Sequence, residues 1–310
     1  MISEIDVAVT TVAFSTDEYL VNRISTAGFR SIKFNDSGKR LASRELNEML
    51  HDVDAAIIGL DRIDFSVLKN SKRLKVISKY GVGLDNINLL DCEKLGVAVC
   101  VCYGVNKRSV AEQVLGCMLM LSRNLYVTSN QLKLGRWNKD GGAQVTGKTV
   151  GIIGLGNIGK EVVELLRPFK CQVLINDIVD QSKFCNEHQL ISVAKDELLR
   201  ESDFVTIHAP LTDELRSYFD YDRLKMMKSS AYFINTARGE LINQEDLKRA
   251  LKENVIAGAA IDVFDNEPPD DMDFIGLPNL IATPHVGGNS REAVRSMGEA
   301  AIEQLISFYA

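Results

Sequence analysis

A glycine motif between an apolar run and a helix-like stretch constrains this chain more than any other feature. The pattern G-x-G-x-x-G occupies Gly154–Gly159, directly after the apolar run Thr149–Ile153. In this setting the first glycine makes a tight turn, the second lets the backbone approach a pyrophosphate, and the third lets the helix pack on the strand. Phosphates then lie at the helix N-terminus, where free N–H groups favour anions. The motif predicts a dinucleotide site, and the alternative is a glycine-rich structural turn.

An acidic residue follows the next apolar run at the spacing that such a site requires. The run Gln172–Asn176 ends directly before Asp177, at roughly the 20-residue distance where an acid binds the adenosine ribose hydroxyls. A carboxylate repels a 2′-phosphate, and no Arg or Lys occurs among the next residues, Ile178–Asp180. We therefore expect NAD(H) rather than NADP(H) as the cofactor.

Length and charge set outer bounds on the class of protein. A chain of 310 residues favours two domains. The net charge of −6 argues against a nucleic-acid partner, because no basic surplus exists to neutralise phosphates. Met1–Asp6 lacks a signal-peptide pattern, and the longest apolar run, Val114–Leu121, is too short to span a membrane. We expect no membrane partner and a cytoplasmic location.

The cysteines do not form a metal-binding pattern. Cys100-x-Cys102 falls inside an apolar strand pattern and no second pair accompanies it. We expect buried free thiols in a reducing compartment and no metal. The cysteines are Cys92, Cys100, Cys102, Cys117, Cys171 and Cys185.

Short apolar runs alternate with helix-like stretches along most of the chain, which predicts parallel βαβ units and doubly wound sheets. In the first hundred residues we expect strands at Val7–Thr11, Ser31–Phe34, Ala55–Leu60, Leu74–Ser78 and Val97–Cys102, with helices near Asp17–Ile24, Glu45–Leu50 and Phe65–Leu68. Beyond the glycine motif we expect strands at Phe204–His208, Tyr232–Asn235, Ala257–Val263 and Leu280–Thr283.

Two longer helices are also expected. Ser109–Glu112 matches a capping box and predicts the start of a helix that reaches about Leu134, followed by a loop over Gly135–Gly147. The last segment, Ser290–Phe308, has an apolar residue at every fourth position, which indicates a helix with one buried stripe. We expect this helix to pack on the first domain. The stripe consists of Ala293, Met297, Ala301 and Leu305.

Reactive side chains follow three strands of the second half, where doubly wound sheets bind ligands. Arg238 comes after Tyr232–Asn235, and a guanidinium can hold a carboxylate through two parallel hydrogen bonds. Glu267 precedes two prolines that would stiffen its loop. His285 lies between a proline and a glycine pair, which suits an imidazole that acts as acid or base. The alternatives are a surface arginine and a solvated acid.

The other histidines have weaker signals. His208 ends a strand, so it either lines the cofactor cleft or packs inside the protein. His51 and His188 fit structural or surface positions.

Together these three side chains suggest a reaction of a 2-hydroxy or 2-oxo acid. Arg238 would anchor the carboxylate and polarise the C2 oxygen, and His285 would exchange a proton with that oxygen. Glu267 would hold the imidazole and stabilise its protonated form. The cofactor supplies the redox chemistry, and the protein supplies orientation and the proton.

Six motifs of the chain together resemble those of a known protein family. They are Lys79–Ile87, Ser109–Glu112, Gly147–Gly159, Asn235–Gly239, Asp262–Pro269 and Pro284–Gly288. The chain resembles the D-isomer-specific 2-hydroxyacid dehydrogenases, and within them the D-3-phosphoglycerate dehydrogenase branch, as a short form that ends at Ala310 without a regulatory domain. Formate dehydrogenases of this superfamily usually carry glutamine at the position of Glu267, so the resemblance argues against formate.

The resemblance implies two doubly wound parallel-sheet domains. Residues 1–104 and 288–310 would form a flavodoxin-like substrate domain, and residues 105–287 an inserted Rossmann domain that binds NAD and builds a homodimer. It implies Arg238, Glu267 and His285 as the catalytic set, and Val82 and Gly83 at the cleft. The implied cofactor contacts are Gly154, Gly156, Asn157, Ile158, Gly159, Asp177, His208, Ala209, Pro210, Thr236, Ala237, Asp262 and Gly288.

Three cationic side chains affect which substrate we expect. Lys79, Lys107 and Arg108 could receive a second anionic group while Arg238 takes the C1 carboxylate; the alternative is that they are solvated charges. We therefore expect 3-phosphoglycerate and 3-phosphohydroxypyruvate, or a similar dianion, and a role in serine biosynthesis. The competing hypotheses are a glyoxylate or hydroxypyruvate reductase and an NAD-sensing binding protein like the corepressors that share this fold.

Overall fold

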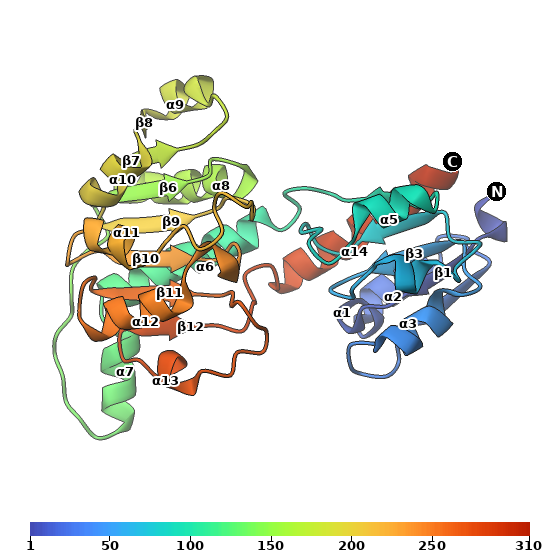
Figure 1. Cartoon of the computed structure of the whole chain (residues 1–310), viewed down its shortest axis with the longest axis horizontal. Coiled ribbons are helices and arrows are strands. Elements are labelled where there is room, and N and C mark those ends of the chain that lie inside the picture. The colour runs from blue at the N-terminus through green and yellow to red at the C-terminus, as the bar shows by residue number, and fades with distance from the viewer. The chain divides into compact units, whose positions relative to one another are not determined.

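The computed structural model describes residues 1–310, which form two compact units (Figure 1). Unit 1 contains Met1–Asn106 and Gly288–Ala310, and unit 2 contains Lys107–Gly287. The chain passes from unit 1 to unit 2 after residue 106, whereas we expected this boundary after residue 104. It returns to unit 1 after residue 287.

Unit 1 is built on a parallel sheet of five strands in the order β2-β1-β3-β4-β5. Its strands are β1 (Asp6–Val9), β2 (Ser31–Phe34), β3 (Ala55–Ile58), β4 (Val76–Lys79) and β5 (Ala98–Cys100). Every residue of β1, β3 and β4 is buried, because helices cover both faces of these inner strands. This strand order is the flavodoxin-like doubly wound order, so the expected fold is confirmed for this unit.

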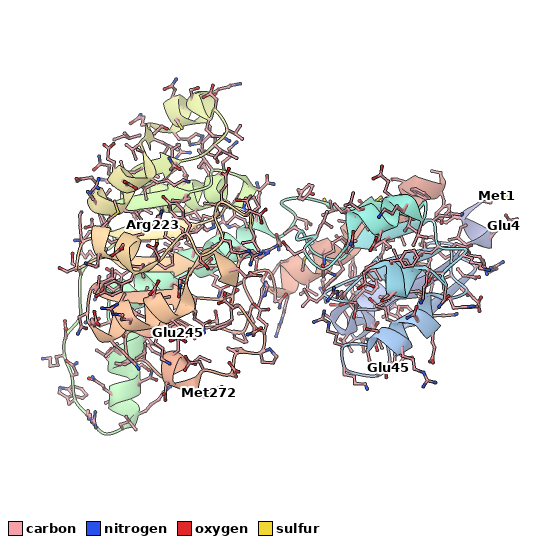
Figure 2. All side chains as sticks on the ribbon, in the orientation of Figure 1. Met1, Glu4, Glu45, Arg223, Glu245 and Met272 are labelled. Atoms are coloured by element: carbon pink, nitrogen blue, oxygen red, sulfur yellow. The ribbon has the colours of Figure 1, made fainter.

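Alternate residues of the inner strands point to opposite faces of the sheet, where they pack in two separate hydrophobic cores. Ala8 packs on the helices α3 to α5, whereas Val7 and Val9 pack on α1, α2 and α14. The helices are α1 (Val12–Ser15), α2 (Glu18–Ser25), α3 (Ser43–Leu50), α4 (Phe65–Leu68), α5 (Leu89–Lys94) and α14 (Arg291–Tyr309), preceded by the 3-10 turn η1 (Ile2–Glu4). Glu45, labelled in Figure 2, stabilises the start of α3 by accepting a hydrogen bond from the Ala42 N–H at 2.7 Å.

The final helix confirms the sequence expectation. All members of its apolar stripe are buried, and Met297, Ala301 and Leu305 belong to a core of unit 1, although they come from the far end of the chain. Gly298 on α14 lets this helix approach α2 closely, because a Cβ at that position would lie 2.4 Å from a methyl carbon of Leu20.

Unit 2 is built on a parallel sheet of seven strands in the order β12-β11-β10-β9-β6-β7-β8. Its strands are β6 (Thr149–Ile153), β7 (Gln172–Asn176), β8 (Ile191–Ser192), β9 (Phe204–Ile207), β10 (Tyr232–Asn235), β11 (Gly258–Ile261) and β12 (Leu280–Ala282). The chain runs outward from β6 to β8 and then returns to place β9 on the other side of β6. Such a switch point opens a crevice at the carboxyl ends of the two central strands.

Helices cover both faces of this second sheet. One face packs on α6 (Lys107–Ser122) and α8 (Asn157–Leu166). The other packs on α10 (Lys195–Glu201), α11 (Tyr221–Met226), α12 (Gln244–Lys252) and α13 (Met272–Ile275). The remaining elements are α7 (Leu125–Lys133), α9 (Ser182–His188), η2 (Arg167–Phe169) and η3 (Gly239–Leu241).

The expected helix from Ser109 to Leu134 is wrong in two respects. The chain breaks it into α6 and α7 at Asn124, whose φ of 50° is left-handed and cannot continue a right-handed helix. The expected capping box is also wrong, because α6 already begins at Lys107. Ser109 lies inside the first turn, and its hydroxyl donates to the carbonyl of Gly287 at 2.6 Å.

No helix of the chain combines the length and the apolar character needed to cross a membrane.

Candidate active site

The glycine motif joins β6 to α8, and its three glycines differ in what a side chain would meet. Gly154 has a φ of 93°, and a Cβ there would lie 2.7 Å from the carbonyl carbon of His208. A Cβ on Gly159 would lie 2.3 Å from the Gly154 oxygen. Gly156, in contrast, faces open space. The first and third glycines thus let the turn close on β9 and on itself, and the second leaves an open surface at the start of α8, where Asn157 and Ile158 form the first turn.

Asp177 holds the glycine turn from the end of β7. Its Oδ2 accepts from the Leu155 N–H at 2.6 Å, and its Oδ1 accepts from the Val179 N–H at 2.8 Å. A carboxylate has about four lone-pair positions, so both oxygens can accept further hydrogen bonds from ribose hydroxyls. The geometry fits a nucleotide whose pyrophosphate lies at Gly156 and whose ribose lies at Asp177.

Two buried polar atoms near the same sheet edge have no hydrogen-bond partner within the protein. They are the Thr236 hydroxyl oxygen, after β10, and Nδ1 of His208, after β9. Buried polar groups are normally satisfied, so these atoms fit a site that a ligand completes. Burial lowers the pKa of His208 to about 3, so its ring is neutral at ordinary pH. Ala209 and Pro210 continue the same loop, and Pro210 is exposed.

A histidine and a glutamate form the clearest reactive pair of the chain. Nδ1 of His285 lies 2.8 Å from Oε2 and 3.0 Å from Oε1 of Glu267. Oε1 also accepts from the Phe264 N–H at 3.2 Å, which orients the carboxylate. Because Glu267 engages Nδ1, the opposite ring nitrogen, Nε2, is the one that can exchange a proton with a substrate. Both side chains remain partly exposed, at 41% and 37%.

Arg238 lies on the turn that follows β10, one residue before the point where this turn meets the loop of Glu267. Asn235 fixes the turn, since its amide donates to the Arg238 carbonyl at 2.7 Å and its Oδ1 accepts from the Ala237 N–H at 3.0 Å. Arg238 Nη1 donates to the Ala237 carbonyl at 2.6 Å. The adjacent Gly239 touches the loop of Glu267, because a Cβ there would lie 2.1 Å from the carbonyl carbon of Phe264.

Asp262 has a role that the sequence did not indicate. Its carboxylate is buried, with 1% of the residue exposed. It accepts from the Thr283 hydroxyl at 2.5 Å, from the Val286 N–H at 2.9 Å and from the Gly287 N–H at 2.7 Å. Asp262 therefore anchors the loop that carries His285, and its contact with the cofactor stays a prediction.

Lys79, which we expected to receive a second anionic group of the substrate, is largely occupied inside unit 1. Only 4% of the residue is exposed. Its ammonium donates to the Gly59 carbonyl and to Oδ1 of Asn86, at 2.5 and 2.6 Å. Lys79 thus ties the loop after β3 to the loop after β4, where Val82 and Gly83 are half-buried. Gly288 also belongs to unit 1, where it packs on Asn106.

The two cations in the first turn of α6 also have partners within the chain. Lys107 and Arg108 each form an ion pair at 3.1 Å with Glu161 of α8, and Arg108 also pairs with Glu112 at 2.8 Å. The expected second-anion role for this pair is not supported by the geometry, because both cations already join α6 to α8.

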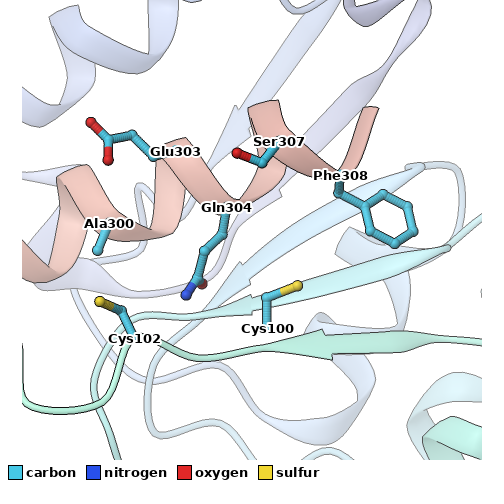
Figure 3. Close-up of a pocket in the computed structure, with 7 residues that line it drawn as sticks. All are labelled: Cys100, Cys102, Ala300, Glu303, Gln304, Ser307 and Phe308. Atoms are coloured by element: carbon cyan, nitrogen blue, oxygen red, sulfur yellow. The ribbon is translucent and has the colours of Figure 1, made fainter. Parts of the chain in front are cut away.

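The cysteines are free thiols, but only part of them are buried. Cys92, Cys117 and Cys185 are buried, whereas Cys100, Cys102 and Cys171 are half-buried. Cys100 and Cys102 line a groove of about 490 Å³ beside α14 (Figure 3), because β5 is an edge strand and leaves this side open. Burial raises the pKa of the Cys100 thiol, which reduces its reactivity.

Comparisons with known proteins agree with this geometry. Residues 115–287 match the family model described as D-isomer specific 2-hydroxyacid dehydrogenase, NAD binding domain. The chain is 37% identical over 274 residues to the glyoxylate reductase of Thermofilum pendens. This match covers 85% of the chain and 80% of that protein. A crystal structure of the TT0316 protein from Thermus thermophilus has a TM-score of 0.88 at 29% identity and covers 98% of this chain and 96% of that one.

The chain is also 35% identical over 270 residues to the D-3-phosphoglycerate dehydrogenase of Methanocaldococcus jannaschii. That match covers 86% of this chain but 51% of the relative, so the chain spans about half the length of that protein. These matches show the class: the chain belongs to the D-isomer specific 2-hydroxyacid dehydrogenase family. Residues 115–287 form its NAD-binding domain.

Proposed function

We propose that this protein interconverts a small D-2-hydroxy acid and its 2-oxo acid, with glyoxylate or hydroxypyruvate as the preferred oxo acid. The observation that carries the proposal is the pair of His285 and Glu267, 2.8 Å apart, in the same unit as Arg238 and the glycine turn. Bound NADH supplies the hydride for this reaction. Gly154, Gly156 and Gly159, with Asp177, would hold it.

Each of the three side chains has a separate role in the proposal. Arg238 binds the carboxylate of the oxo acid and draws electron density from the C2 oxygen. His285 donates a proton from Nε2 to that oxygen during reduction and accepts it during oxidation. Glu267 accepts from Nδ1, which sets the orientation of the ring and stabilises its positive charge. Thr236 and Ala237, on the turn before Arg238, would contact the cofactor.

The choice of a small oxo acid follows from where the cations are. A dianionic substrate needs a second cation besides Arg238, and Lys79, Lys107 and Arg108 all have partners within the chain. Relatives named glyoxylate reductase and hydroxypyruvate reductase at 37% and 32% identity agree with this choice.

A phosphorylated oxo acid is the second candidate. It is supported by the relative named D-3-phosphoglycerate dehydrogenase at 35% identity. A role in serine biosynthesis depends on this candidate and stays a prediction, as does the cytoplasmic location. Direct contacts of Lys79, Val82 and Gly83 with substrate also stay predictions.

Turnover with NADH and a panel of oxo acids tests the proposal. Glyoxylate and hydroxypyruvate should be reduced with higher kcat/KM than pyruvate or 3-phosphohydroxypyruvate, and chiral products should have the D configuration. Lys79→Ala should lower kcat/KM for glyoxylate and 3-phosphohydroxypyruvate by the same factor, because it loosens two loops rather than removing a phosphate contact. A selective loss with the phosphorylated acid would favour the second candidate. NADH binding without turnover of any oxo acid would instead indicate a nucleotide-sensing protein.

We also propose that the protein is a homodimer that associates through unit 2. The segment around α7 exposes apolar side chains that monomeric proteins rarely display together. Leu132, Leu134 and Trp137 are 54%, 71% and 79% exposed, and they accompany a groove of about 740 Å³ along α7. Light scattering should give twice the chain mass for the native protein and a shift toward the monomer for Trp137→Ala. A native mass of one chain would contradict the proposal.

A further inference from the structure

Two side chains of α6 donate hydrogen bonds to the two ends of the loop that carries His285. The Ser109 hydroxyl donates to the Gly287 carbonyl at 2.6 Å, and Nε2 of Gln113 donates to the Thr283 hydroxyl at 2.9 Å. Ser109 and Gln113 are four residues apart, so they lie on the same face of the helix. The loop is therefore held from one side by α6 and from the other by Asp262.

The hydrogen-bond directions in this network permit only one orientation of the Gln113 amide. Asp262, as a carboxylate, only accepts, so the single hydroxyl hydrogen of Thr283 is donated to it at 2.5 Å. The Thr283 oxygen must then accept from Gln113, and only the amide nitrogen can supply that hydrogen. Oε1 of Gln113 faces Gly287, where a Cβ would lie 2.8 Å away. The side chain at position 113 thus has to be a donor of this length.

The loop needs this support because His285 has an unusual backbone conformation. Its φ is 52°, in the left-handed region that residues other than glycine seldom adopt. Its N–H donates to the Thr283 carbonyl at 3.0 Å, which closes a tight turn. In this conformation Nδ1 of the ring meets Glu267. A loop that relaxed toward an ordinary φ would turn the ring away from the carboxylate.

The same helix is tied to the start of the cofactor-binding region. Lys107 and Arg108, in the first turn of α6, form ion pairs with Glu161 of α8, and α8 begins at the glycine turn. One helix therefore contacts both the helix expected to hold the pyrophosphate and the loop that carries the proton donor. All of these residues belong to unit 2.

We propose that Ser109 and Gln113 are positioning residues of the reaction. Through Gly287 and Thr283 they hold His285 in the conformation in which its ring is oriented by Glu267. The inference rests on the proposed function for its kinetic consequence, but it concerns residues outside the proposed catalytic set.

The test replaces the donor at position 113 in two ways. Gln113→Leu removes the hydrogen bond with little change in volume, and Gln113→Glu keeps the shape but can only accept, so it competes with Asp262 for the Thr283 hydrogen. Each variant should lower kcat for the best oxo acid by about 10-fold, because misplacing a catalytic group by a fraction of an ångström has effects of this order. The KM for oxo acid and the Kd for NADH should stay within about 2-fold of the native values.

A background without the histidine separates positioning from general damage. In the His285→Ala protein, Gln113→Leu should cause no further loss of kcat, since residues that act as one unit are not additive. Glu112→Ala serves as the matched control, because Glu112 neighbours Gln113 but is exposed and has Arg108 as its polar partner. It should leave kcat and the melting temperature unchanged.

An unchanged kcat in both Gln113 variants, or an equal loss in the His285→Ala background, would overturn the inference. Failure of the proposed function would be seen separately, as absence of turnover in the native protein. In that case the positioning role is tested by the ring ¹⁵N signals of His285, which are assigned by comparison with His285→Ala. Displaced signals in Gln113→Glu and native signals in Glu112→Ala support the positioning role, and native signals in Gln113→Glu overturn it.

Discussion

Gly239→Ala should disable the reaction by separating Arg238 from Glu267. The added Cβ would lie 2.1 Å from the carbonyl carbon of Phe264, 2.3 Å from its oxygen and 2.6 Å from the Asp265 nitrogen. Ordinary contacts begin near 3.4 Å, so the turn and the loop must move apart by about 1 Å. These contacts are to backbone atoms, so no side-chain rotation can relieve them.

A displacement of this size in a catalytic group costs about 100-fold in rate. Because Gly239 is buried, the same overpacking should also lower the free energy of unfolding by about 1–3 kcal/mol. We therefore expect kcat/KM for the best oxo acid to fall about 100-fold, while the Kd for NADH changes much less.

Gly156→Ala is the matched control. The Cβ at this position would meet no atom within 4 Å, and the backbone φ of −76° suits alanine. The melting temperature should therefore stay close to the native value. The methyl group would occupy the surface that the pyrophosphate approaches, so the Kd for NADH should rise. Steady-state kinetics, NADH fluorescence titration and thermal unfolding measure the three quantities. Native kcat/KM in Gly239→Ala would refute the reasoning, as would native NADH affinity in Gly156→Ala.

Three further predictions concern single side chains. His285→Ala should lower oxo-acid turnover by about 10²–10⁴-fold, the usual contribution of a positioned acid, with NADH binding nearly intact; turnover near the native value would assign the proton to another residue. Asp177→Ala should narrow the preference for NADH over NADPH, and equal kcat/KM with both cofactors in the native protein would contradict this. His208 has a folded-state pKa of about 3, below the unfolded value near 6.5, so only the unfolded chain gains its proton as the pH falls from 7 to 5. This should reduce the free energy of unfolding by about 2 kcal/mol; urea titrations of the native protein and His208→Asn at both pH values should show the loss only in the native protein.

Local physics accounts for the parts of the fold that the sequence predicted. Strand β2, at the edge of its sheet, has the expected bounds although its residues alternate between exposed and half-buried positions. Strands β6, β7 and β10, which are mostly buried, begin and end where their apolar runs do. A buried parallel strand requires such a run, and a glycine or polar residue ends it. Other strands stop earlier than their apolar runs; β3, for example, ends at Ile58, because Gly59 directs its carbonyl to Lys79 instead of to the sheet.

The break between α6 and α7 could not be predicted in the same way. The apolar pattern continues across Asn124, and only the left-handed backbone at that residue ends the helix. Asparagine tolerates this conformation better than most residues, which is the one signal in the sequence. The choice between a bent and a continuous helix depends on packing, which a single sequence does not reveal.

The candidate site also has a part that the sequence predicted and a part that it did not. The types and spacing of Arg238, Glu267 and His285 were sufficient to select them, because each follows a strand whose carboxyl end must face the same sheet edge. The sequence by itself thus determined the cofactor fold and selected the three side chains that we propose as catalytic. Tertiary structure decided which other polar groups are available to ligands. Lys79 became a buried link between two loops and Asp262 the anchor of the histidine loop, because a charge excluded from water takes the nearest protein partner. Two of these partners, Gly59 and Gly287, are 20 and 25 residues away along the chain.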